Sequence, residues 1–256
     1  MDKILTVATW NISEGHLARS SKLFDYDQEE NLEYFVVQLR KINPEIICLP
    51  EINMPNKQDG VTLTSRIAKS LGFDNSHEKP FHHSLFYKDR SLGLGLVSSL
   101  NFSVTDVPLD QPDFPLIFEN GTPASDHTRW LFVADFESFA LATTHNWPMR
   151  VFQHSYDSEP GAGYGRYLDK TYLQVLPNNK PLIFAGDLNF NTPETVIPQT
   201  INTFKLHEAL PQDQPTRNDN NRSDHILYGP GFECIEAKIV PGKGDHYLCY
   251  AKLKLQ

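Results

Sequence analysis

The sequence predicts an α+β fold in which two largely antiparallel sheets pack face to face and helices cover their outer faces. Strand-like runs are numerous, and many of them follow one another as hairpin-like neighbours. Helical periodicity appears early and late in the chain, at roughly matching places in two halves. Elements in this arrangement favour layered packing around a shared core. Because no repeat or low-complexity linker interrupts the chain, we expect residues 1–256 to form a single domain.

Composition supports a globular protein and excludes several other classes. The 256 residues are 39% hydrophobic and 11% aromatic, which supplies a sizeable core and excludes disorder. No window approaches eighteen consecutive apolar residues, and the N-terminus lacks the pattern of a signal peptide. The three cysteines, Cys48, Cys234 and Cys249, are widely spaced, which favours free thiols over a disulfide framework. We expect a cytoplasmic monomer without a transmembrane segment.

The net charge of −9 argues against strong non-specific binding of nucleic acid through a basic surface. It leaves a nucleic-acid substrate open, because divalent cations can neutralise phosphate locally. Part of the acidic excess could itself bind metal.

Three segments have the apolar spacing of helices, residues 27–42, 61–73 and 166–176. Gly72 is expected to end the second and Pro177 the third. In the first segment four apolar residues share one face: Leu32, Phe35, Val36 and Leu39.

The remaining regular segments are strand-like. They are residues 4–12, 45–50, 83–88, 92–99, 102–107, 129–136, 139–147, 181–187, 223–229, 232–240 and 246–255. A tight turn at Glu137 and Ser138 joins two of them as a hairpin. The Pro-, Asp- and Gly-rich residues 108–127 and the polar residues 211–223 are typical of loops.

Polar side chains stand where six of these strands end or begin. They are Asn11, Glu51, His145, Asn146, Asp187, Asn189, Asp224, His225, Asp245 and His246. Taken singly, each has a structural interpretation as a cap, a turn residue or an ordinary histidine. Together they favour a cluster of hard oxygen ligands with imidazoles, which suits Mg²⁺ or Mn²⁺ better than zinc.

The stretch "PLIFAGDLNFNTPE", residues 181–194, is the least ordinary of these strand ends. Its glycine permits close backbone approach, and Asp187 and Asn189 lie two residues apart and so face the same way. Asn191 is expected to be a cap or turn residue before Pro193.

The motifs "TWN", "LPE", "GDLN" and "GDHY", in this order, resemble the endonuclease/exonuclease/phosphatase superfamily from about residue 10 to residue 246. Its members include DNase I, apurinic endonucleases, neutral sphingomyelinases, inositol-polyphosphate phosphatases and a tyrosyl-DNA phosphodiesterase. The resemblance implies a DNase I-like, four-layered α/β sandwich with two central, mostly antiparallel sheets.

The resemblance also implies a metal site that binds Mg²⁺, with Mn²⁺ as the other candidate. Glu51 resembles the principal metal-binding glutamate, Asn11 the asparagine near the metal and the attacking water, and Asp245 a further aspartate beside the metal. Pro50 stands where the family usually has glutamine, and Gly244 stands where it commonly has serine.

The same resemblance implies catalytic roles for five residues. Asp187 and Asn189 resemble the catalytic aspartate–asparagine pair. His145 resembles the histidine that contacts a phosphoryl oxygen, His246 the final histidine of the family, and Asp224 the aspartate that orients it. His225 stands where many nucleases have tyrosine or tryptophan.

We therefore predict a Mg²⁺-dependent phosphoesterase that hydrolyses a phosphodiester by in-line attack of water. The general base is predicted to be Asp187, with the His246–Asp224 pair as the alternative. The expected partner is a phosphoester substrate, first of all a nucleic acid or nucleotide. A lipid or inositol phosphoesterase and a non-catalytic binding module are the alternatives.

Loops rather than the scaffold choose the substrate. The predicted substrate loops are residues 53–60, 108–127, 148–165 and 211–223. Around the third of them Arg150, His154 and Arg166, with several aromatic residues, could hold a phosphate and stack a base. An ordinary surface turn is the competing interpretation.

Overall fold

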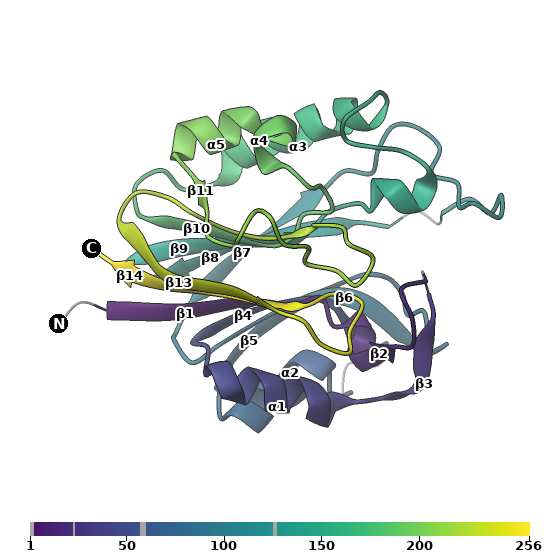
Figure 1. Ribbon diagram of the computed structural model, residues 1–256, viewed down its shortest axis with the longest axis horizontal. Coiled ribbons are helices and arrows are strands. Elements are labelled where there is room, and N and C mark those ends of the chain that lie inside the picture. Colours follow the sequence, from purple (N-terminus) through teal and green to yellow (C-terminus); the bar gives the residue numbers. More distant parts are fainter. Residues whose placement is uncertain (1–2, 23, 57–59, 125–126) are drawn as a thin grey trace.

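The computed structural model describes residues 3–22, 24–56, 60–124 and 127–256. Two six-stranded sheets pack face to face, with helices on both outer faces (Figure 1). The predicted four-layered α+β sandwich of the DNase I-like class is confirmed. In the described part of the chain, no helix is both long enough and apolar enough to span a membrane.

The first sheet contains both ends of the chain and has the strand order β13-β14-β1-β4-β6-β5. Its strands are β1 Lys3–Thr9, β4 Ile46–Pro55, β5 Asn75–His83, β6 Arg90–Ser98, β13 Phe232–Val240 and β14 Leu248–Leu255. β1 pairs antiparallel with β14, from Lys3 opposite Leu255 to Thr9 opposite Cys249. β1 and β4 are the parallel pair of this sheet.

The second sheet has the order β11-β12-β10-β9-β8-β7. Its strands are β7 Ser103–Leu109, β8 Arg129–Phe136, β9 Phe139–His145, β10 Leu182–Asp187, β11 His207–Glu208 and β12 Asp224–Tyr228. β9 and β10 run parallel and end together, with Asp187 opposite His145. A separate two-stranded ribbon is formed by β2 His16–Ala18 and β3 Tyr26–Glu30.

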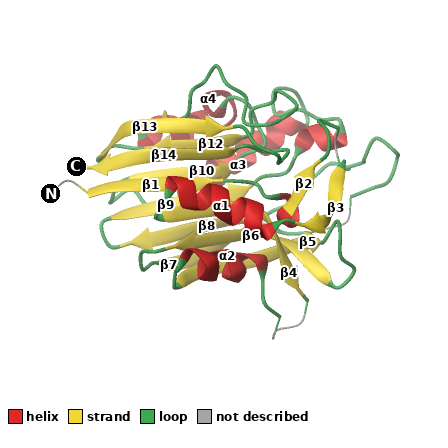
Figure 2. Cartoon of the chain, turned by 60° about the horizontal axis from the view of Figure 1, so that its bottom comes forward, coloured by secondary structure: helices red, strands yellow, loops and turns green. Residues whose placement is uncertain are grey.

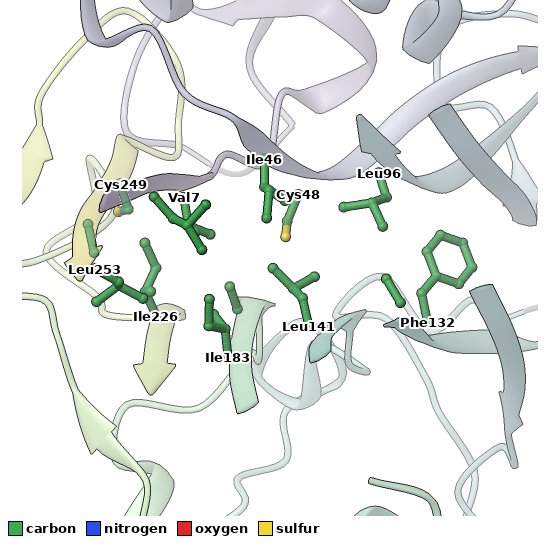
Figure 3. Close-up of a cluster of buried hydrophobic side chains, with 14 of the residues drawn as sticks. Val7, Ile46, Cys48, Leu96, Phe132, Leu141, Ile183, Ile226, Cys249 and Leu253 are labelled. Carbon is green, nitrogen blue, oxygen red and sulfur yellow. The ribbon is translucent and has the colours of Figure 1, made fainter. Parts of the chain in front are cut away.

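Apolar side chains from the two sheets meet in a central core (Figure 3). Val7 and Ile46 come from the first sheet, and Leu141 and Ile183 come from the second; all four are fully buried. Burial of side chains of this size stabilises the fold by about 1.5–3 kcal/mol each. Cys48 and Cys249 are buried in this core as free thiols, which agrees with their predicted place in apolar strands.

Two helices cover the first sheet, α1 Leu32–Ile42 and α2 Leu63–Leu71 (Figure 2). α1 buries Phe35, Val36 and Leu39, three of the four residues predicted to share a face. Thr62 caps α2 by accepting a hydrogen bond from the Ser65 amide. Gly72 ends α2 in the left-handed region at φ +75°, a conformation that glycine adopts without steric cost.

Three helices cover the second sheet: α3 Gly161–Val175, α4 Pro193–Val196 and α5 Pro198–Phe204. Two short 3-10 segments, η1 Ser13–Gly15 and η2 Met149–Phe152, follow β1 and β9. Asp169 of α3 accepts hydrogen bonds from the backbone amides of Gln199 and Thr200, which joins the first turn of α5 to α3.

Some local predictions were wrong. Residues 83–88 were expected to form a strand, but β5 ends at His83 and a turn follows. The Ser84 hydroxyl accepts the amides of Phe86 and Tyr87, which closes that turn, and Phe86 stacks on the His16 ring at 3.7 Å. The apolar side chains of this segment therefore pack outside the sheet. Likewise, the first residues of the helix predicted over 27–42 belong to β3.

Candidate active site

The polar strand ends meet at the edge of the sandwich opposite the chain termini (Figure 1). A cavity of about 250 Å³ lies there. Six of the eight predicted site residues line it: Glu51, His145, Asp187, Asn189, Asp245 and His246. The other two, Asn11 and Asp224, lie behind the wall and hydrogen-bond to Asp187 and His246. The structure thus brings all eight residues together.

Asp187, the last residue of β10, is the centre of the cluster. Its Oδ2 accepts a hydrogen bond from Asn11 Nδ2 at 3.0 Å. Two imidazole nitrogens face the same oxygen, His145 Nε2 at 3.4 Å and His246 Nε2 at 3.7 Å. Burial raises the pKa of Asp187, although His246 lies near enough to act against this shift. A buried carboxylate with a raised pKa is suited to accept a proton.

The backbone on either side of Asp187 has conformations that favour particular residues at positions 186 and 189. A Cβ on Gly186 would lie 2.3 Å from the Thr144 carbonyl oxygen of the neighbouring strand, so only glycine fits. Asn189 has a left-handed backbone at φ +57°. Its amide donates to Asp187 Oδ1 at 3.1 Å, and its side-chain Nδ2 donates to the Asn146 carbonyl at 2.9 Å. The turn after β10 is therefore fastened to the end of β9.

Glu51 reaches the cavity from a bulge inside β4. The pairing register between β4 and β6 shifts between Pro50 and Ile52, and Glu51 sits at φ +59°. Bulges of this kind re-aim a side chain at the cost of regular pairing. Burial, and next the nearby carboxylate of Asp245, raise the pKa of Glu51 to about 7.

His246 is held between carboxylates. Its Nδ1 lies 2.8 Å from Asp224 Oδ2. Burial and the adjacent Arg217 disfavour its cationic form, but Asp224, Asp187 and Asp245 outweigh them and raise the pKa of His246 to about 9. Within the described residues, the other oxygen of Asp224 is buried without a hydrogen-bond partner.

Arg217 enters the site from the loop of residues 211–223. The backbone amide of Asn218 donates to the Asp245 carbonyl at 2.9 Å, and that of Tyr247 donates to the Thr216 carbonyl at 2.8 Å. These bonds carry the Arg217 guanidinium to His246 Nε2 and to within 3.5 Å of Asp245 Oδ2. The sequence had marked this loop for substrate contact but gave no reason to select Arg217.

Asp245 is fixed by three donors. Ser13 Oγ donates to Oδ1 at 2.6 Å, the Tyr26 hydroxyl donates to Oδ2 at 3.0 Å, and Arg217 lies nearby. Burial acts against ionisation, yet His246 and Arg217 lower the pKa of Asp245 below its ordinary value. Asp245 therefore stays ionised at neutral pH. Ser13 and Tyr26 lie far from it in the sequence and had no signal that sequence reasoning could use.

Arg129 is a further cation that the sequence analysis missed. It is the first residue of β8 and is 5% exposed. Its Nη1 lies 3.0 Å from His145 Nδ1, and the guanidinium lies over the Phe81 ring at 4.2 Å and the Trp147 ring at 5.2 Å. Its position at the start of an apolar strand was the feature of the sequence that could have identified it.

The donor set of the cavity fits a divalent cation that prefers oxygen. Glu51 and Asp245 supply carboxylates to the cavity. Asn11 lies behind the wall, where its Nδ2 donates to Asp187 and its Oδ1 accepts from the Ser13 amide, so it supports the site without lining it. Burial, and next the Asp245 carboxylate, disfavour the ionised form of Glu51, and a cation bound beside the two carboxylates would offset both effects. A second group, Asp187, Asp224 and His246, also has atoms close enough to hold an ion. In that group, however, Asp224 and His246 already bond to each other.

Two other predicted residues lie apart from the cavity. His225 is fully buried, with Nδ1 2.5 Å from Glu208 Oε2 and Nε2 2.8 Å from the Phe190 carbonyl. Arg166 is exposed and pairs with Glu159. Neither residue lines the cavity, so the suggested phosphate contact of Arg166 is not supported.

The predicted substrate loops contribute unequally. Arg150 and His154 line the cavity, and Arg150 pairs with Asp219 at 2.7 Å. Asn191 accepts the backbone amide of Arg222 and so ties the β10 turn to residues 211–223. Of the loop predicted over 53–60, residues 57–59 lie outside the described part of the chain.

Comparison with solved structures agrees with the class of fold. An endonuclease/exonuclease/phosphatase of Beutenbergia cavernae superposes with a TM-score of 0.72 at 17% identity, over 99% of this chain and 72% of that chain. The catalytic domain of human Nocturnin with bound sulfate anion superposes with a TM-score of 0.59 at 15% identity, over 100% of this chain and 98% of that chain. An AP endonuclease of Archaeoglobus fulgidus superposes with a TM-score of 0.57 at 16% identity, over 96% of this chain and 98% of that chain. These likenesses define a DNase I-like sandwich.

The family follows from the sequence match. The model of the Endonuclease/Exonuclease/phosphatase family matches residues 8–246. The chain belongs to this family, whose members are mostly hydrolases of phosphoester bonds. No curated protein sequence matches the chain.

Proposed function

We propose that this protein is a Mg²⁺-dependent phosphodiesterase that acts on a nucleotide or a nucleic acid by attack of water. One observation carries the proposal. The buried carboxylate of Asp187 meets the Nε2 atoms of His145 and His246 beside a cavity that Glu51 and Asp245 also line. A base, two donors and a cluster of oxygen ligands are the parts that phosphoryl transfer to water requires.

Asp187 accepts the proton of the attacking water. Each of its two oxygens accepts one hydrogen bond, Oδ2 from the side chain of Asn11 and Oδ1 from the backbone amide of Asn189. These two bonds fix the plane of the carboxylate. A base held in this way is already oriented before the substrate binds, which lowers the entropic part of the barrier.

His145, His246 and Arg217 face the place where negative charge develops on phosphorus-bound oxygens. His246 is oriented by Asp224, and Arg217 brings positive charge to the same space from the 211–223 loop, where its guanidinium donates to His246 Nε2. Positive groups that are positioned before the reaction stabilise the transition state without reorganisation.

Glu51 and Asp245 would hold the metal ion, with Asn11 beside Glu51. A bound Mg²⁺ supplies Lewis-acid stabilisation of a phosphoryl oxygen. Ser13 and Tyr26 keep Asp245 in the orientation that this requires.

The cavity walls support a nucleotide-sized substrate. At about 250 Å³ the cavity is compact, and Phe152 and Tyr156 line it together with Arg150. Aromatic faces stack bases, and arginine pairs with phosphate. Two solved neighbours agree with this choice, because one is an AP endonuclease and another binds sulfate, an anion shaped like phosphate. The net charge of −9 favours a nucleotide or a strand end over the interior of a duplex.

A second candidate is a phosphoesterase of lipids, and one observation favours it. An apolar cleft of about 390 Å³ adjoins the cavity and shares Phe24, Tyr26, Leu85 and Phe118 with it. Phe24 and Leu85 are half exposed at this place. An alkyl chain leaving the phosphate would find an apolar surface here.

A substrate panel separates these functions. Purified protein is assayed with Mg²⁺ and with EDTA on single- and double-stranded DNA, RNA, dinucleotides, bis-p-nitrophenyl phosphate, sphingomyelin and inositol phosphates. We expect the highest kcat/KM on nucleotides or single strands, and loss of activity in EDTA. Preference for sphingomyelin, weakened by Leu85→Ser, would select the lipid function. Inactivity on every ester would leave the binding-module alternative.

A further inference from the structure

The two histidines that face Asp187 have opposite partners at their Nδ1 atoms. His246 Nδ1 lies 2.8 Å from a carboxylate oxygen of Asp224, an acceptor. His145 Nδ1 lies 3.0 Å from Nη1 of Arg129, a donor. The more usual arrangement in enzyme sites is the first, in which the ring donates its Nδ1 proton to oxygen.

The chemistry of arginine decides the tautomer of His145. A guanidinium has five N–H donors and no acceptor, so it can bond an imidazole nitrogen only through that nitrogen's lone pair. His145 Nδ1 therefore carries no proton, and the proton of the neutral ring lies on Nε2. That atom faces the cavity, 3.4 Å from Asp187 Oδ2 and 3.7 Å from Glu51 Oε1.

Arg129 is held firmly enough to impose this choice. The faces of Phe81 and Trp147 receive its guanidinium at 4.2 and 5.2 Å. Cation–π contacts gain strength when they are desolvated, and Arg129 is 5% exposed. Burial lowers the pKa of Arg129 to about 10, which leaves it charged at neutral pH.

We propose that Arg129 is a positioning residue that fixes His145 as a neutral Nε2–H donor to a phosphoryl oxygen of the substrate. The tautomer itself follows from the geometry, whereas its use in the reaction rests on the proposed function. In this arrangement the ring offers Asp187 and the substrate a hydrogen bond without placing a second imidazolium beside the base. His246 has the reversed pattern, because its Nδ1 donates to Asp224 and its Nε2 accepts from Arg217, and the Arg217 guanidinium supplies the positive charge.

The first test observes the tautomer without any substrate. Two-bond ¹H–¹⁵N correlation spectra of ¹⁵N-histidine-labelled protein distinguish Nδ1–H from Nε2–H rings, and His145→Gln identifies the His145 signals by their loss. We expect the Nε2–H pattern for His145 in the wild type. Arg129→Met, which keeps an unbranched apolar stem against both rings, should move His145 toward the Nδ1–H form. Arg166→Met, which removes an exposed arginine outside the cavity, should leave the pattern unchanged.

The second test measures how the two residues act together in catalysis. We expect Arg129→Met to lower kcat at least about tenfold with a smaller change in KM, as for an interaction made in the transition state. In a His145→Ala background the same change should have little further effect, because Arg129 acts through the ring. Arg129→Lys keeps a positively charged donor group on one nitrogen and should recover part of the loss.

Three outcomes would overturn the proposal: an Nδ1–H ring at His145 in the wild type, an unchanged tautomer in folded Arg129→Met, or kcat losses that multiply in the double variant. Thermal melting shows whether Arg129→Met is folded, and Arg129→Gln serves as the second variant if it is not. If the wild type hydrolyses no phosphoester, the proposed function fails while the tautomer experiment still decides the role of Arg129.

Discussion

Asn11 and Asp187, 176 positions apart in the sequence, are joined by a hydrogen bond of 3.0 Å from Nδ2 to Oδ2. Asn11 follows β1 of the first sheet, and Asp187 ends β10 of the second. The proposed base is therefore oriented by a residue of the opposite layer. The site exists only when the two sheets are packed together.

Replacing Asp187 by asparagine should abolish most of the activity. The amide has nearly the same shape but accepts no proton, so we expect turnover to fall by about 10²–10⁴-fold. Steady-state rates on the best substrate of the panel measure the effect. Asp135→Asn, which changes an exposed carboxylate paired with Lys180 outside the cavity, is the matched control. Turnover near that of the wild type in Asp187→Asn would falsify its role as base.

Magnesium should stabilise the folded protein through Glu51. A ligand that binds only the folded state raises its stability by about 2.7 kcal/mol at a concentration 100 times its Kd. We expect thermal melting to shift upward with Mg²⁺ and the shift to disappear with EDTA or in Glu51→Gln. Glu45→Gln, at a carboxylate that accepts the Thr6 amide away from the cavity, should keep the shift. A full Mg²⁺ shift in folded Glu51→Gln contradicts the metal assignment.

Gly186 should tolerate no side chain. A methyl group there would lie 2.3 Å from the Thr144 carbonyl oxygen. The paired backbones of β9 and β10 fix both positions, so neither group can move away independently. We expect Gly186→Ala to lower the free energy of unfolding by about 1–3 kcal/mol. Gly163→Ala, in α3 and beside only the exposed ends of the Glu159 and Arg166 side chains, should be neutral or stabilising, since alanine favours helix. Equal urea midpoints for the two variants would refute this account.

The buried Glu208–His225 pair should matter for stability and not for turnover. Glu208 accepts from the Leu210 amide and lies near His225 and Arg222. Removing one partner of a buried pair costs about 3–5 kcal/mol, so Glu208→Gln should unfold at lower urea. Turnover at low temperature, where the variant is still folded, should change little because neither residue lines the cavity.

The same pair makes the free energy of unfolding depend on pH, and the pKa shift of Glu208 fixes the sign of this dependence. Burial opposes ionisation of Glu208, but His225 and Arg222 hold its pKa below the ordinary value. The unfolded chain then binds more protons than the folded chain as the solution is acidified. The contribution is complete above the unfolded pKa of about 4.3 and is lost as pH falls through the lower folded pKa. Urea titrations from pH 7 to pH 3 should show the wild type and Glu208→Gln converging; a constant difference contradicts this.

The apolar pattern of a segment predicted its strand correctly wherever the segment's own residues determined which of its side chains are buried. The hairpin of β8 and β9, the strand β10 and the strand β13 lie where alternating or continuous apolar runs placed them. β5 was missed because its residues, from Asn75 to His83, carry His, Glu, Lys and Pro in place of an apolar face. Its position is decided by pairing with β6, a contact between segments.

The sequence by itself determined which residue types stand at the strand ends, and through their order the family to which the chain belongs. It placed Glu51, His145, Asp187 and His246 as candidates before any contact between them was known. The tertiary structure alone decided their partners, because a hydrogen bond such as that from Trp10 to the His246 carbonyl, 236 positions away, depends on the pairing of β1 with β14. The opposite tautomers of His145 and His246 arise at that level, from the donor or acceptor that packing puts beside each ring.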